Sequence, residues 1–257
     1  MKMDNLLINI HLLTVIFAVV AFFYASVGLG GGSSYTALLA LAGAGVVTIP
    51  MVSLTLNLVV TTIGSIIFLS KRHGRLRLIA PFLISSIPMS YVGGMLHLPK
   101  TVFYLVLLVS LAVAAIRVYF PGDTKPLALD NRARVLAALL CGAVLGLVAG
   151  IAGIGGGVYL VPLIIILGLG TAKEAAACGA FFIWANSVAG LAARLQHHSI
   201  DLTSFLPLIL GVVAGGMAGS LLGAGRFEPR TMQRILGSIL VVAIVFLGRK
   251  IAEAVMF

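Results

Sequence analysis

Long uncharged stretches dominate this chain. No Lys, Arg, Asp or Glu occurs in the 66 residues between Asp4 and Lys71, in the 38 between Arg134 and Lys173, or in the 24 between Asp201 and Arg226. A helix needs about 20 mainly apolar residues to cross the hydrocarbon core of a bilayer. Because no alternating β-barrel pattern accompanies these stretches, we expect membrane-spanning α-helices.

Polar breaks divide the apolar sequence into ten segments, which lie at 6–27, 33–47, 51–70, 78–97, 101–120, 135–152, 158–170, 175–194, 203–224 and 235–248. We therefore expect a first transmembrane repeat over 6–120, a polar linker over 121–134 and a second repeat over 135–250. Segments 33–47 and 158–170 reach only about 20–23 Å, less than the ~30 Å core. Either they cross or they belong to re-entrant hairpins, so the predicted fold is an all-α integral membrane protein with about 8–10 transmembrane segments.

The two halves share motifs in the same order. Gly28-Leu-Gly-Gly-Gly32 matches Gly153-Ile-Gly-Gly-Gly157 at an offset of 125, and Asn57 matches Asn186 at 129. Pro99-Lys-Thr101 matches Pro229-Arg-Thr231 at 130. The chain crosses ten times, or six times with two re-entrant hairpins, which leaves five or three crossings, an odd number, in each half. The halves are therefore expected to be inverted repeats of each other.

Composition excludes the soluble classes. The chain is 61% apolar and 9% charged, which is too little charge for the surface of a soluble globular protein of this size. A soluble enzyme, a disordered tail and a coiled coil are therefore excluded. Its net charge of +10 is interpreted as loop charge on a membrane protein and not as a nucleic-acid footprint. With loop 71–77 in the cytoplasm, alternation places 12 basic residues inside and 5 outside. This bias predicts both termini outside and the lipid bilayer as a partner.

Two glycine clusters are the candidate substrate site. Four glycines in five positions do not favour continuous helix, and broken segments at matching places of two halves indicate a transporter's binding site. The backbone N–H groups freed at the start of each following helix suit an anion. The expected site residues are Gly30, Gly31, Gly32, Ser33, Ser34, Asn57, Gly155, Gly156, Gly157, Asn186 and Trp184. For Asn57, Asn186 and Trp184 the alternative is packing or an interhelical hydrogen bond.

Other glycines are expected to serve close helix packing. Gly211, Gly215, Gly216 and Gly219, together with Gly93 and Gly94, would let helices touch backbone to backbone. The two cysteines, Cys141 and Cys178, are interpreted as small packing residues.

Catalytic and metal chemistry find no support in the sequence. No nucleophile triad, carboxylate pair, CxxC or P-loop lysine occurs, so we expect no enzyme, no cofactor and no metal site. His197 and His198 are adjacent, with no third ligand apparent nearby. The pattern also indicates no buried Lys or Arg, which predicts an anion site built from backbone dipoles and neutral donors.

The paired glycine motifs, the second followed by Val161-Pro162, resemble the TauE/SafE family of bacterial sulfite exporters over roughly residues 12–250. The resemblance implies transport, usually outward, of small sulfur-containing anions such as sulfite or organosulfonates across the bacterial cytoplasmic membrane. In the first half, Ala37 stands where the second half has Pro162, a departure from the fuller pattern.

The residues by themselves indicate an inverted-repeat permease with an anion site, and the alternatives are an anion channel, a permease for a non-sulfur anion and a membrane scaffold. A coupling ion, a proton or another, and homo-oligomerisation are left open by the sequence.

Overall fold

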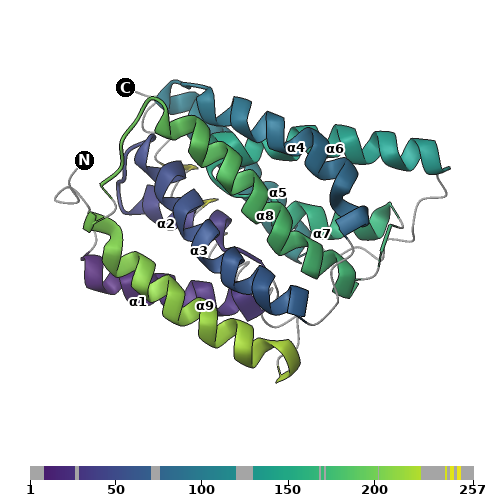
Figure 1. The fold of residues 1–257 in the computed structure, drawn as a ribbon. Helices are drawn as coiled ribbons and strands as arrows, with labels where there is room; N and C mark the ends of the chain where they lie inside the picture. The colour runs from purple at the N-terminus through teal and green to yellow at the C-terminus, as the bar shows by residue number, and fades with distance from the viewer. Residues whose placement is uncertain are drawn as a thin grey trace.

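The computed structural model describes residues 9–26, 29–70, 76–119, 130–167, 169–170, 172–201, 203–226, 241, 244–245 and 248–249. Helices form all the regular secondary structure in these ranges (Figure 1). They are α1 (Ile10–Ser26), α2 (Gly32–Leu41), α3 (Thr48–Ser70), α4 (Leu76–Met95), α5 (Lys100–Tyr119), α6 (Asn131–Ala152), α7 (Gly157–Ile166), α8 (Ala172–Leu195), the short 3-10 helix η2 (Thr203–Phe205) and α9 (Leu206–Arg226).

The predicted all-α membrane fold is confirmed. Five stretches in the described part are long and apolar enough to cross a bilayer, namely Thr48–Ile66, Leu78–Met95, Asn131–Ala152, Cys178–Leu195 and Thr203–Leu221. Large apolar side chains remain exposed along single helix faces. On α6 these are Leu136, Leu140 and Val144, which are spaced four residues apart and are 59–62% exposed. Such a stripe is costly in water but suits contact with lipid.

Most expected segments coincide with helices, with small shifts at their ends. Helix α6 begins at Asn131, inside the expected linker, because the Asp130 side chain caps it and accepts a 2.8 Å hydrogen bond from the Ala133 N–H. The rest of that linker, 121–129, lies outside the described residues. So do most of segment 235–248 and the basic residues Lys71, Arg72 and Arg75.

Helices α2 and α7 are too short to cross a bilayer alone. Each has 10 residues, or about 15 Å at 1.5 Å per residue. They occupy the start of expected segments 33–47 and 158–170, and the described residues after them are not helical until α3 and α8 begin. The two short helices lie toward opposite ends of the bundle (Figure 1).

Glycines set the closest helix contacts. Helix α9 packs along α1, and α6 packs along α4 (Figure 1). A Cβ on Gly215 of α9 would lie 1.9 Å from the Ala18 carbonyl oxygen, and one on Gly146 of α6 would lie 2.2 Å from the Ser86 carbonyl oxygen. Gly211, Gly219, Gly93 and Gly94 make similarly close approaches, so their expected packing role is confirmed. Gly216 instead meets Val60 at an ordinary 3.5 Å.

Candidate functional site

The two glycine segments meet in the interior of the bundle. We define the first glycine segment as residues 29–32 and the second as 153–157; Gly28 lies outside the described residues. The Ser53 hydroxyl of α3 can donate to the Gly153 carbonyl at 2.8 Å or to the Gly32 carbonyl at 3.2 Å. A Cβ on Gly32 would lie 2.4 Å from the Ile154 carbonyl oxygen. The main chains of the two glycine segments, which are more than 100 residues apart in the sequence, are therefore in direct contact.

The Asn57 side chain lies among glycines of both segments. Added Cβ atoms on Gly30, Gly32 and Gly155 would fall 2.9, 2.3 and 3.0 Å from its amide atoms. Its Nδ2 donates to the Gly153 carbonyl at a long 3.5 Å, and its Oδ1 has no hydrogen-bond partner among the described residues although Asn57 is 0% exposed. A buried amide atom without a partner is costly. Asn57 thus offers a weakly engaged donor and a free acceptor at the meeting point of the segments.

Helix α2 begins beside this amide, and α7 begins two residues after Gly155, which also approaches it. Gly31, which precedes α2, has φ of 88° and provides no side-chain cap, and Gly153, Gly155 and Gly156 before α7 also have positive φ. Glycine adopts this left-handed backbone without strain. The first N–H groups of a helix have no acceptor within that helix, and its N-terminal end carries partial positive charge. The arrangement therefore favours an anion near Gly32 and Gly157.

Ser33 and Ser34 are bound to a tyrosine. The Tyr24 hydroxyl of α1 hydrogen-bonds to the Ser33 Oγ at 2.8 Å and to the Ser34 Oγ at 3.0 Å, and all three residues are buried. Sequence reasoning missed Tyr24, because one tyrosine in an apolar helix carries no spacing signal. The hydroxyls of the two serines thus hold α2 against α1 in this structure.

The matched asparagines occupy different environments. The Asn186 Nδ2 donates at 2.9 Å to the Phe182 carbonyl on its own helix, and its backbone oxygen accepts from the Ser90 hydroxyl at 2.8 Å. Its Oδ1 has no hydrogen-bond partner in the described part of the chain. Trp184 is half-buried on α8 and stacks on Phe181 with ring centroids 5.8 Å apart. Two residues on a helix are about 200° apart, so Trp184 and Asn186 lie on opposite faces.

Ile183 is a second residue that sequence reasoning missed. Its side chain lies 2.3 Å from where a Cβ on Gly157 would be placed, 2.7 Å from one on Gly155 and 3.0 Å from one on Gly30. Ile183 is 3% exposed. It therefore packs against both glycine segments from α8, as Asn57 does from α3.

The expected absence of a buried arginine is wrong. Arg194 near the end of α8 is 7% exposed, and its Nη2 donates to the carbonyls of Gly150 and Ile151, both at 2.8 Å. These carbonyls lie in the last turn of α6, directly before the second glycine segment. Arginine satisfies such free carbonyls and complements the negative helix end. The sequence places Arg194 close to a segment end, which alone gives no indication of burial.

A third histidine, His97, contacts both His197 and His198. Its ring centroid lies 5.6 Å from that of His197 and 5.4 Å from that of His198. No group of three or more His, Cys, Asp or Glu side chains in the described ranges has an arrangement that could hold a metal ion. Cys141 and Cys178 are free thiols, as interpreted from the sequence.

Comparisons with known proteins agree over most of the chain. A family model described as "Sulfite exporter TauE/SafE" matches residues 13–247. A curated protein of Sinorhizobium fredii, "Probable membrane transporter protein y4hK", is 37% identical over 235 residues, which cover 90% of this chain and 95% of that protein. No solved structure matches.

Proposed function

This chain belongs to the TauE/SafE sulfite exporter family and is a membrane transporter, not an enzyme; we propose that it exports small sulfur-containing anions, such as sulfite or organosulfonates, across the bacterial cytoplasmic membrane. The sulfur chemistry comes from the family description. The anion itself is supported by the structure of the glycine segments. The proposal therefore has two independent supports.

The observation that carries the proposal is that both glycine segments, which lead into the short helices, approach the Asn57 amide. Gly32 and Gly155 both approach its amide, and no Asp or Glu is recorded in contact with these glycines in the described part. The N–H groups around Gly30–Ser34 and Gly155–Val158 would hold the anion, and the Asn57 Nδ2 would add a side-chain donor. The free Asn57 Oδ1 would accept a hydrogen bond from the hydroxyl group of a protonated oxyanion. We leave Trp184 and Asn186 out of this proposed site, because Trp184 stacks on Phe181 and the Asn186 Nδ2 is bound to the Phe182 carbonyl of its own helix.

Alternating access would follow from the exchange of helices between the halves. The first helix of each half packs along the fourth helix of the other, α1 with α9 and α6 with α4. The short helices α2 and α7 lie toward opposite ends of the bundle (Figure 1). Both features support the proposed inverted repeat. Rocking of one half against the other about α3 and α8 would open the site to each side in turn.

Transport and binding measurements test the site. We expect the protein in liposomes to show saturable uptake of ³⁵S-sulfite that is accelerated by sulfite on the opposite side, as a carrier requires. Asn57→Ala should weaken sulfite binding at least about tenfold, since a hydrogen bond to a charged group contributes roughly 1.5–3 kcal/mol.

Asn186→Ala is the matched control, because Asn186 is an equally buried asparagine whose Nδ2 is bound to its own helix. Its sulfite affinity should stay within about twofold of wild type. Equal losses of sulfite affinity in both variants would show that Asn57 does not contact the anion. Single-channel currents without counterflow would show that the protein is an anion channel and not a carrier. The absence of any flux would support a membrane scaffold.

The proposed orientation places both termini and the loop 196–203 outside the cell. The test uses single cysteines in a chain in which Cys141 and Cys178 are replaced by serine and alanine. A membrane-impermeant maleimide should label Ser199→Cys in intact cells, whereas His73→Cys should react only after permeabilisation. Ser199 is exposed and follows α8. The reverse labelling pattern would invert the topology.

A further inference from the structure

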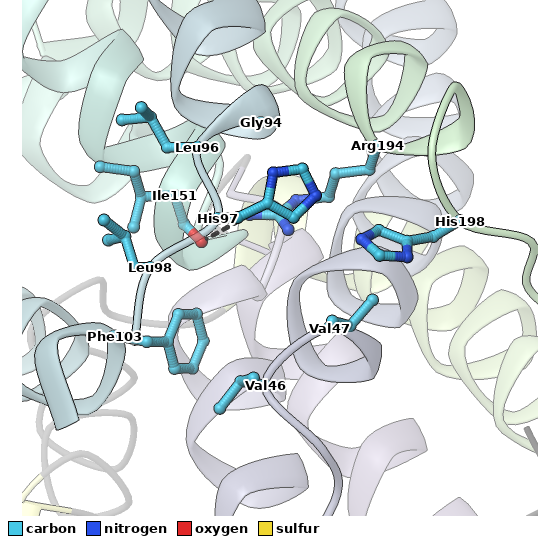
Figure 2. A pocket seen from close by; sticks show the side chains of 10 residues that line it. All are labelled: Val46, Val47, Gly94, Leu96, His97, Leu98, Phe103, Ile151, Arg194 and His198. Atoms are coloured by element: carbon cyan, nitrogen blue, oxygen red, sulfur yellow. Dashed lines mark hydrogen bonds between the residues drawn. The ribbon is translucent and has the colours of Figure 1, made fainter. Parts of the chain in front are cut away.

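A cavity lies at one end of the bundle, where the connections α2–α3, α4–α5 and α8–α9 meet. Its volume is about 80 Å³, and roughly 10–15 Å³ by this kind of measure holds one water. A molecule of about five or six non-hydrogen atoms is therefore of suitable size. Arg194, His97 and His198 line it on one side, and Val46, Leu98 and Phe103 contribute apolar surface (Figure 2). We call it the Arg194 cavity.

The Arg194 guanidinium is only partly satisfied. Its Nη2 binds two α6 carbonyls, but its Nε has no hydrogen-bond partner among the described residues. No carboxylate pairs with it in that part of the chain. Burial of a cation without a counter-charge is unfavourable. Capping of α6 explains the Nη2 contacts and leaves the Nε and the uncompensated charge unexplained.

Among the described residues, those that line the cavity with Arg194 are titratable or uncharged, and none is a carboxylate. His97 and His198 both line the cavity with Arg194, and His97 also contacts the His197 ring. The opposite wall is apolar, and Phe103 is 4% exposed. A cation and imidazoles facing hydrocarbon would accommodate an anionic head group on a short apolar tail.

We propose that the Arg194 cavity is a second anion site, which binds a small organic anion by its head group through Arg194, His97 and His198 and by its tail against Val46, Leu98 and Phe103. This rests on the proposed function in taking the ligand from the transported class, short-chain sulfonates. In the proposed topology the cavity lies on the outer side, separate from the central site at Asn57.

Binding at this site should be linked to proton uptake. Burial, and the nearby charges of His97, Arg194 and His197, lower the pKa of His198. A bound anion would offset these positive neighbours and raise that pKa. Affinity should therefore rise as the pH falls through the interval between the two pKa values. Asp201, in the same connection, would not contribute to this pH dependence. Hydrogen bonds from Thr203 and Ser204 lower its pKa to about 2, so it stays ionised over this pH range.

Histidine NMR locates the binding directly. Full-length protein labelled with ¹³C-histidine is titrated from pH 5 to 8 in detergent, with and without ethanesulfonate, and the five histidine signals are assigned by His→Gln variants. We expect saturating ethanesulfonate to raise the pKa of His198 by at least about half a unit. The exposed His11 on α1 is the control and should not change. An unchanged His198 titration at saturation would overturn the proposal.

Binding measurements on variants separate this site from the central one. His198→Gln, which leaves the α6 cap intact, should weaken ethanesulfonate binding at pH 6 several-fold and less at pH 8, while His11→Gln should have no effect. Arg194→Gln should abolish the His198 response. If liposomes show no flux but the His198 response persists, the cavity proposal stands and the transport proposal fails. If Asn57→Ala removes all binding and His198→Gln removes none, the cavity proposal fails alone.

Discussion

Gly32→Ala is expected to lower sulfite flux at least about tenfold, the largest effect of any single methyl group at the candidate site. The added Cβ would lie 2.3 Å from the Asn57 Nδ2 and 2.4 Å from the Ile154 carbonyl oxygen. The second of these atoms is backbone, so the two glycine segments would have to separate. Gly32 lies in α2 and has no positive φ, so the effect comes from space and not from backbone strain. Initial rates of ³⁵S-sulfite uptake into liposomes measure it.

Gly64→Ala is the matched control for Gly32→Ala. Gly64 is a helical glycine of α3 whose added Cβ would meet only the Ala180 Cβ at 3.9 Å. Alanine in a helix interior is favoured over glycine by about 0.5–1 kcal/mol, so this variant should transport normally and unfold at a slightly higher temperature. Flux in Gly32→Ala within twofold of Gly64→Ala would show that the glycine segments do not need to touch for transport.

Gly215→Ala is expected to destabilise the protein by about 1–3 kcal/mol, through overpacking of the contact between α1 and α9. Its Cβ would lie 1.9 Å from the Ala18 carbonyl oxygen and 2.7 Å from the carbonyl carbon. Both atoms are backbone, so relief requires movement of the whole of α1. Detergent-solubilised protein is heated and then run on a size-exclusion column. The temperature at which the monodisperse peak is lost should be several degrees lower for Gly215→Ala than for wild type.

The neighbouring glycine provides the control. A Cβ on Gly216 would meet Val60 side-chain atoms at 3.5 Å, an ordinary contact. Gly216→Ala should therefore match or slightly exceed the wild-type transition temperature. Gly146→Ala, at the corresponding contact between α6 and α4, should behave like Gly215→Ala because its Cβ would lie 2.2 Å from the Ser86 carbonyl oxygen. Equal stability of Gly215→Ala and Gly216→Ala would argue against backbone-to-backbone packing as the determinant.

Much of the fold was predictable from local sequence. The uncharged stretches predicted the helices, because burial of charge in hydrocarbon is costly wherever it occurs along a span. The glycine clusters predicted where helices would be short, since α2 and α7 begin at Gly32 and Gly157. Both signals depend on consecutive residues, so neither needs knowledge of the tertiary structure.

The partners of polar side chains could not be predicted in the same way. Asn57 and Asn186 match between the halves, yet only Asn57 is recorded in contact with the glycine segments in the described structure. Ser53, Tyr24 and Ile183 acquire their roles from elements distant in sequence. A membrane helix is apolar on all sides, so its periodicity does not distinguish a face against protein from a face against lipid.

The sequence by itself thus determined that this protein is an all-helical membrane protein with two glycine-rich segments, because charge exclusion and glycine's backbone freedom act locally. Only the tertiary structure decided that these segments touch through Gly32 and Ile154, and that Arg194 is buried against the end of α6. Those facts depend on which helix faces pack together. Packing in a bilayer is selected by close backbone contact and hydrogen bonding between distant segments, and such contacts leave little trace in hydrophobicity.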